Sequence, residues 1–96
     1  MIKIVKLISG EEIIGEVTES NGSITIKKPC VLQIVPSRTN PEQPAMGLFP
    51  YAAYVESHTI TLKEDSIVWK EDPLKELYNQ YNSVFGNGLV VATGKI

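Results

Sequence analysis

Residues 2–26 have the sequence IKIVKLISGEEIIGEVTESNGSITI, and this stretch decides the fold of the chain. Apolar and β-branched side chains are interspersed with lysines over residues 2–8, which predicts a first strand. A second strand is expected over 13–18. The dipeptide Asn21-Gly22 then predicts a tight hairpin, because both residues tolerate positive φ. The chain therefore begins as antiparallel strands joined by short turns.

The rest of the chain continues this pattern with one interruption. A third strand is expected from 23 to 35, with an edge, bulge or bend at Pro29, because proline has no N–H to donate to a sheet. Four prolines in residues 36–50 predict a long exposed loop. A fourth strand is expected over 51–62 and a fifth over 66–71, joined by a tight turn.

A helix with clear boundaries is predicted over residues 73–86. Asp72 is the expected N-cap, and Pro73 suits the first helical position because its missing N–H costs nothing there. Gly86 is the expected C-terminal glycine, and 87–96 is a tail. One apolar stripe has helical spacing and consists of Leu74, Leu77, Tyr78, Tyr81, Val84 and Phe85.

The expected fold is mostly β: a small five-stranded, strongly bent antiparallel barrel over residues 1–72 with a C-terminal amphipathic helix. Gly15 in mid-strand agrees with sharp curvature. The helix is expected to cover the open end of the barrel or a neighbouring subunit. Trp69 is expected to share a face with Ile67 and to pack in the core.

The composition is that of one globular domain. The chain has 96 residues, a net charge of −2 and a pI near 5.3, so it lacks the strongly basic character typical of proteins that bind the phosphate backbone non-specifically. No segment has the roughly 18 consecutive apolar residues that would predict a membrane span. Cys30 is the one cysteine, which excludes an internal disulfide. A cytoplasmic location is expected.

Residues that could carry out catalysis are few. His58 is the one histidine and is expected to lie at the surface or in an interface. Cys30 is expected to be a small buried hydrophobe, and no second thiol stands near it to complete a metal site. The acidic pairs Glu11-Glu12 and Glu64-Asp65 are expected to be solvated charges on turns. These observations predict a protein that is not an enzyme and has no catalytic residue, metal site or cofactor.

Two segments resemble the two sequence motifs of the Sm and Sm-like proteins. Residues 7–17 match the first motif: hydrophobe, glycine turn, hydrophobe, glycine and hydrophobe at Leu7, Gly10, Ile13, Gly15 and Val17. Residues 60–67 are similar to the second motif, in which an Arg-Gly-Asn/Asp turn joins the last two strands. The chain looks like a divergent member of this family from a phage or a bacterium.

The resemblance implies a homo-oligomeric ring of roughly five to seven subunits, closed by cyclic symmetry, with single-stranded RNA bound at the pore. The family's nucleotide-contacting positions correspond to Asn21, Ser23 and Thr25 in the hairpin and to Lys63 and Asp65 in the second turn. Ser23 has no ring on which a base could stack. Lys63 stands where arginine is usual, and Glu64 stands where glycine is usual.

An alternative function follows from the weak stacking chemistry and the negative net charge. The chain would then be an oligomeric scaffold or an adaptor that binds protein, with a vestigial RNA site. Phe49, Tyr51 and Tyr54, at the end of the proline-rich loop, are the residues expected to contact such a partner.

Overall fold

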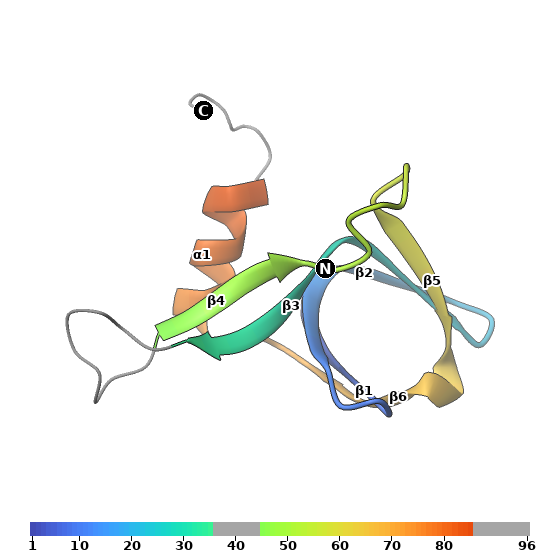
Figure 1. Ribbon diagram of the computed structural model, residues 1–96. Helices are drawn as coiled ribbons and strands as arrows, with labels where there is room; N and C mark the ends of the chain where they lie inside the picture. Colours follow the sequence, from blue (N-terminus) through green and yellow to red (C-terminus); the bar gives the residue numbers. More distant parts are fainter. Residues whose placement is uncertain (36–44, 86–96) are drawn as a thin grey trace.

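The computed structural model describes residues 1–35 and 45–85, and within them the chain forms an antiparallel sheet of six strands followed by one α-helix (Figure 1). The elements are β1 Ile2–Leu7, β2 Glu12–Ser20, β3 Ser23–Val35, β4 Ala45–Pro50, β5 Thr59–Lys63, a 3-10 turn Glu64–Ser66, β6 Ile67–Glu71 and α1 Lys75–Phe85. The mostly-β architecture with a C-terminal helix is therefore as predicted.

The long strand β3 organises the sheet. Its first half pairs with β5 and its second half pairs with β4, while β2 lies along its other edge. The remaining order is β2, β1 and β6, so the sheet curls round an interior but is not a closed barrel. In the described residues β5 pairs only with β3 and β6 only with β1, and the 3-10 turn joins these two strands.

The bend in β3 has an identifiable cause. Between Ile14 and Glu16 the register with β2 shifts by a bulge, and Lys28 on β3 adopts a positive φ of 53°. A Cβ on Gly15 would lie 2.4 Å from Cγ2 of Ile26 and 3.4 Å from Cα of Pro29. The backbones of β2 and β3 approach so closely here that only glycine fits, which explains both the mid-strand glycine and the bend at the proline.

The curled sheet has two apolar faces with separate cores. The inner face is built round Val5, Ile13, Ile24 and Ile26, which are all 0–2% exposed. On the outer face α1 packs Leu77, Tyr81 and Phe85 against a second cluster that contains Ile2, Ile4, Ile14, Cys30, Leu32 and Leu48. Figure 1 shows α1 beside the β3–β4 half of the sheet, which leaves the outer face of the β5 half uncovered.

Two predictions for the middle of the chain were wrong. Residues 45–50, placed in an exposed loop, form the additional strand β4, because Leu48 pairs with Leu32 and both pack beneath α1. Residues 51–58, placed in a strand, form turns instead, and the next strand begins only at Thr59. Ala52 has a φ of 59°, which breaks an extended conformation. Residues 36–44 lie outside the described part of the chain.

The last strand and the helix differ from expectation at single residues. The register of β6 shifts between its partners Lys6 and Leu7, so Trp69 and Ile67 lie opposite residues on different faces of β1. Trp69 is therefore not a core residue and is 38% exposed. On α1, Tyr81 is buried as expected, whereas Tyr78 is half-exposed. The expected cap Gly86 and the tail lie outside the described residues.

The hairpin after β2 is confirmed. Asn21 and Gly22 have φ values of 46° and 82°, as a two-residue turn of the type with two positive φ angles requires, and Ser20 pairs with Ser23 across it. In the described ranges, no helix has both the length and the apolar character needed to cross a membrane.

Candidate nucleic-acid interface

The two turns suggested by the sequence motifs lie side by side. The register of β3 with β5 places Ser23 directly opposite Lys63. The backbone N–H of Glu64 donates a hydrogen bond of 2.9 Å to the carbonyl oxygen of Gly22, which fastens the 3-10 turn to the hairpin. Gly22, Ser23, Lys63, Glu64 and Asp65 line one shallow depression. Segments some forty positions apart in the chain thus form one surface.

Thr25 lies further along the same face. It is opposite Thr61, and the two Oγ1 atoms are 3.3 Å apart. Because strand residues alternate in direction, Thr25 points to the same side as Ser23, one strand repeat away. Asn21 forms the tip of the hairpin at the other end. The structure therefore brings Ser23, Lys63 and Asp65 together, with Asn21 and Thr25 on either side of them.

The register reveals a larger polar surface that sequence motifs did not identify. Alternate residues of β2, β3 and β5 face outward here, because their neighbours Val17, Ile24, Ile26, Ile60 and Leu62 belong to the inner core. We call this surface the hydroxyl face. It consists of Thr18, Ser20, Ser23, Thr25, Thr59 and Thr61, together with Lys27 and Lys63. The alternation of Ser and Thr in each strand was visible in the sequence, but the pairing of β3 with β5 was not.

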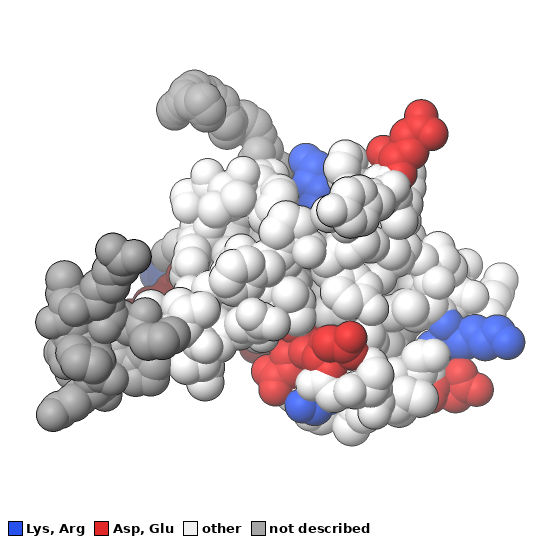
Figure 2. Space-filling view, viewed as in Figure 1, with Lys and Arg blue, Asp and Glu red and all other residues white. Residues whose placement is uncertain are grey.

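The positive and negative charges round the hydroxyl face largely balance. Glu16, next to Lys27 across β2, is paired at 2.7 Å with the N-terminal ammonium group. Within the described residues neither Lys27 nor Lys63 has an ion pair. Glu64 and Asp65 adjoin Lys63 in the turn and reduce the positive potential there. On the face visible in Figure 2 the charged side chains are scattered, with no continuous basic patch.

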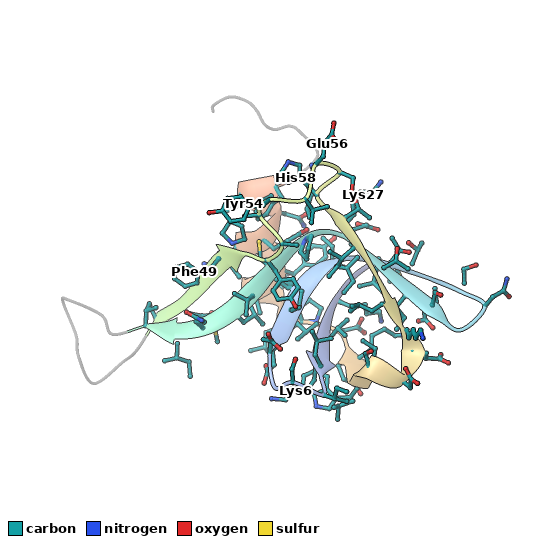
Figure 3. The ribbon with its side chains drawn as sticks, turned by 45° about the vertical axis from the view of Figure 1, so that its right-hand side comes forward. Lys6, Lys27, Phe49, Tyr54, Glu56 and His58 are labelled. Atoms are coloured by element: carbon teal, nitrogen blue, oxygen red, sulfur yellow. The ribbon has the colours of Figure 1, made fainter. Side chains whose placement is uncertain are left out.

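The residues proposed for protein contact differ in how far their side chains are exposed. Tyr54 is fully exposed in the loop after β4, and Figure 3 shows it on the same loop as His58 and Glu56. Phe49 is 42% exposed, with its ring over Gly47. Tyr51 instead packs against the inner core. Only Phe49 and Tyr54 present aromatic surface to a partner.

Cys30 and His58 have reactive side chains, but each lies in surroundings that favour a structural role. Cys30 is fully buried beneath α1, and burial raises the pKa of its thiol to about 11, so little thiolate exists at neutral pH. His58 lies in a turn with a φ of 52° and accepts a hydrogen bond of 2.7 Å from the N–H of Lys28 at its carbonyl oxygen. The parts of the chain that the structure describes contain no group of three metal-binding side chains.

No family model matches the chain, and a search of curated proteins finds no matching relative.

Proposed function

We propose that the protein is a ring-forming, Sm-like protein that binds single-stranded RNA on the surface formed by the hairpin and the 3-10 turn. The observation that carries the proposal is the contact between the two turns, where Ser23 faces Lys63 and Gly22 accepts a hydrogen bond from Glu64. Both turns occupy the positions that the two sequence motifs assign to nucleotide contact.

Assembly is supported by the edges of the sheet. Each of β5 and β6 has one neighbour in the described chain, and an exposed strand edge tends to pair with another strand. The edge strand β6 also exposes apolar surface, because Val68 is 57% exposed and Trp69 is 38% exposed. Pairing of β5 in one subunit with β6 in the next is a head-to-tail contact, which closes into a ring when the rotation between subunits permits it.

The chemistry of the surface suits a phosphate backbone more than a base. Hydroxyl groups and lysines are common donors to phosphate oxygens, and such contacts position a strand without recognising its sequence. Ser23 provides no stacking surface. One subunit would bind RNA weakly, and repetition of the site round a ring would raise the affinity through effective concentration.

The test is fluorescence anisotropy with a labelled oligouridine over a range of salt concentrations. Lys63→Ala is expected to weaken binding and to reduce the log–log salt slope by about 0.7 for each phosphate of a single strand that the lysine no longer neutralises. Glu64→Gly is expected to tighten binding, because it removes a carboxylate next to the phosphates. Lys75→Ala is the matched control, since this lysine lies at the start of α1 and away from both turns.

The outcomes separate the proposal from its alternatives. Native mass spectrometry with and without the oligonucleotide reports subunit number and occupancy together. A ring with no affinity for RNA, or equal effects of Lys63→Ala and Lys75→Ala, would contradict RNA binding at this surface. A monomer at micromolar concentration would contradict the ring.

An oligomeric scaffold or protein-binding adaptor is the second candidate. It is favoured by the full exposure of Tyr54, a large aromatic side chain that adds nothing to the core. If Lys63→Ala has no effect while Tyr54→Ala abolishes an interaction of the protein, this second function takes precedence.

A further inference from the structure

A cavity of about 220 Å³ lies at the end of β5 away from the hairpin. It is lined by Phe85, Tyr51, Pro29 and Pro50, and Lys28, Ala53 and His58 complete its lining. These residues come from the bend in β3, the loop after β4 and the last turn of α1. Three elements thus converge on a site that the proposed function does not use.

The backbone round this cavity has strained φ angles and is fixed by hydrogen bonds. Four non-glycine residues in the described chain have positive φ, and Lys28, Ala52 and His58 are three of them. Such conformations cost of order 1–3 kcal/mol each and are concentrated at binding and catalytic sites. Here the N–H of Tyr51 donates to the carbonyl of Pro29 at 2.9 Å, and the hydroxyl of Tyr81 donates to the carbonyl of Lys28 at 2.8 Å. The cavity is therefore preformed.

The lining indicates what kind of ligand would fit. An apolar protein cavity of about 150 Å³ can hold benzene, so 220 Å³ accommodates one larger planar ring system. A proline-rich peptide requires a longer groove with successive aromatic contacts. In the described residues no carboxylate pairs with Lys28, so its ammonium group is free to contact an anion. A planar ring linked to an anionic group is the chemistry of a nucleotide.

The cavity also adjoins the hydroxyl face. Lys28 follows Lys27 at the bend in β3, and His58 precedes Thr59 at the start of β5, so both strands lead directly to the cavity. From Thr59 to Lys63 the strand β5 covers four residue steps, or about 13 Å. Figure 3 shows Lys27 and His58 on the same side of the molecule, with Glu56 pointing outward from it. A short oligonucleotide could therefore contact the Lys63 turn, the hydroxyl face and the cavity together.

We infer that this cavity holds one nucleobase of the bound RNA strand, with the adjacent phosphate contacting Lys28. The inference rests on the proposed function and supplies the stacking surface that Ser23 lacks. Base–aromatic stacking is a large and sequence-tolerant contribution to single-strand binding. The phosphate backbone would lie along the hydroxyl face, and the base would enter the cavity beside Phe85.

The first experiment uses two variants that are expected to fold. Phe85→Leu keeps an apolar side chain and removes the ring, whereas Lys28→Gly removes the charge and relieves a strained φ. Phe85→Leu is expected to weaken oligouridine binding about fivefold or more and to leave binding of an abasic oligonucleotide unchanged. Lys28→Gly is expected to weaken both and to lower the salt slope. Phe49→Leu is the matched control, because Phe49 lies on β4 outside the cavity.

The second experiment tests the cavity without RNA or assembly. The chain has two phenylalanines, so fluorophenylalanine labelling gives two ¹⁹F signals, one from the cavity and one from the control position. Titration with uridine 5′-monophosphate is expected to shift the Phe85 signal and not that of Phe49.

The results distinguish this inference from the proposed function. If Lys63→Ala weakens RNA binding while Phe85→Leu and Lys28→Gly do not, the cavity assignment is overturned and the proposed function stands. If no oligonucleotide binds but the nucleotide shifts the Phe85 signal, the proposed interface fails, and the cavity is a site for a free nucleotide and not for a base of bound RNA. A shift caused by a proline-rich peptide and not by the nucleotide would overturn the assignment in favour of a peptide site.

Discussion

Gly15 is the residue on which the bend of the sheet depends, and Gly15→Ala is expected to destabilise the protein. Its φ lies outside the left-handed range, so alanine adds no backbone strain. The added Cβ would instead lie 2.4 Å from Cγ2 of Ile26 and 3.1 Å from the carbonyl oxygen of Lys27. Carbon atoms in favourable contact are about 3.5–4.0 Å apart. Ile26 is fully buried and cannot turn away, so β2 and β3 must separate.

The magnitude follows from two opposing effects. Overpacking of a core destabilises the folded state by about 1–3 kcal/mol. Replacing glycine lowers the entropy of the unfolded chain, which stabilises the folded state by about 0.4–1 kcal/mol. We therefore expect a net loss of about 1–2 kcal/mol, which for a domain of this size lowers the Tm by about 4–16 °C.

The assay is urea unfolding followed by circular dichroism, at one fixed protomer concentration because the proposed assembly would affect apparent stability. Gly47→Ala is the control: its Cβ would meet the ring of Phe49, which is half-exposed and free to move, so a change below about 0.5 kcal/mol is expected. In the double variant with Ile26→Leu, which lacks the clashing methyl group, part of the loss should be recovered. Gly15→Ala at or above wild-type stability would refute the steric explanation of the bend.

Two further predictions concern the buried thiol and the free sheet edge. Burial raises the pKa of Cys30 from 9.0 to about 11, so its contribution to stability is fully present below pH 9 and is lost as the pH rises towards 11. The free energy of unfolding, measured from pH 9 to 11, should therefore fall more steeply for wild type than for Cys30→Ala. Parallel curves for the two proteins would contradict this. If the protein forms the proposed ring, Val68→Lys on β6 is expected to yield folded monomers in light scattering. Val84→Lys, at a similarly exposed position on α1, is expected to leave the oligomer intact. An oligomer of unchanged size in Val68→Lys would exclude β6 as the assembly edge.

The features of the fold that could be predicted are those that depend on local sequence. Asn21-Gly22 predicted its hairpin because few other dipeptides adopt two positive φ angles in succession. Gly15 and Pro29 predicted a bend because glycine inside a strand often marks sharp curvature and proline cannot donate a hydrogen bond to a central strand. These signals act within a few residues, so the sequence alone displays them.

The features that were missed depend on pairing between distant segments. The prolines near β4 suggested a loop, yet Pro50 ends an edge strand, where a missing N–H is tolerated. Ala52 and His58 adopt positive φ, which neither residue type signals. The bulge that turns Trp69 away from the core arises from the register with β1. A pattern of alternation cannot reveal such a one-residue shift.

The candidate site also has one part that the sequence predicted and another that it did not. Asn21, Ser23, Thr25, Lys63 and Asp65 were found through two short motifs, and the structure places all five on two adjoining turns and the strand between them. The hydroxyl face and the aromatic cavity were not found, because both require the register of β3 with β5 and the position of the loop after β4.

The distribution of side chains on the outer face of the sheet connects these surfaces. Where α1 covers the sheet, the outward residues are apolar, as Ile14 and Cys30 are. On the uncovered part of β2, β3 and β5 the outward residues are serine, threonine and lysine together with Glu16. A surface built to receive another helix or strand layer would bury these hydroxyls, at a cost for each one left without a hydrogen bond. A phosphate backbone can accept hydrogen bonds from hydroxyl groups and lysines. Under the proposed function, the free edges would pair between subunits and the hydroxyl face would contact RNA. Hydroxyl-to-valine changes at Thr25 and Thr61, which retain size and β-branching, should weaken RNA binding without altering the number of subunits; loss of assembly with binding retained would reverse this division of roles.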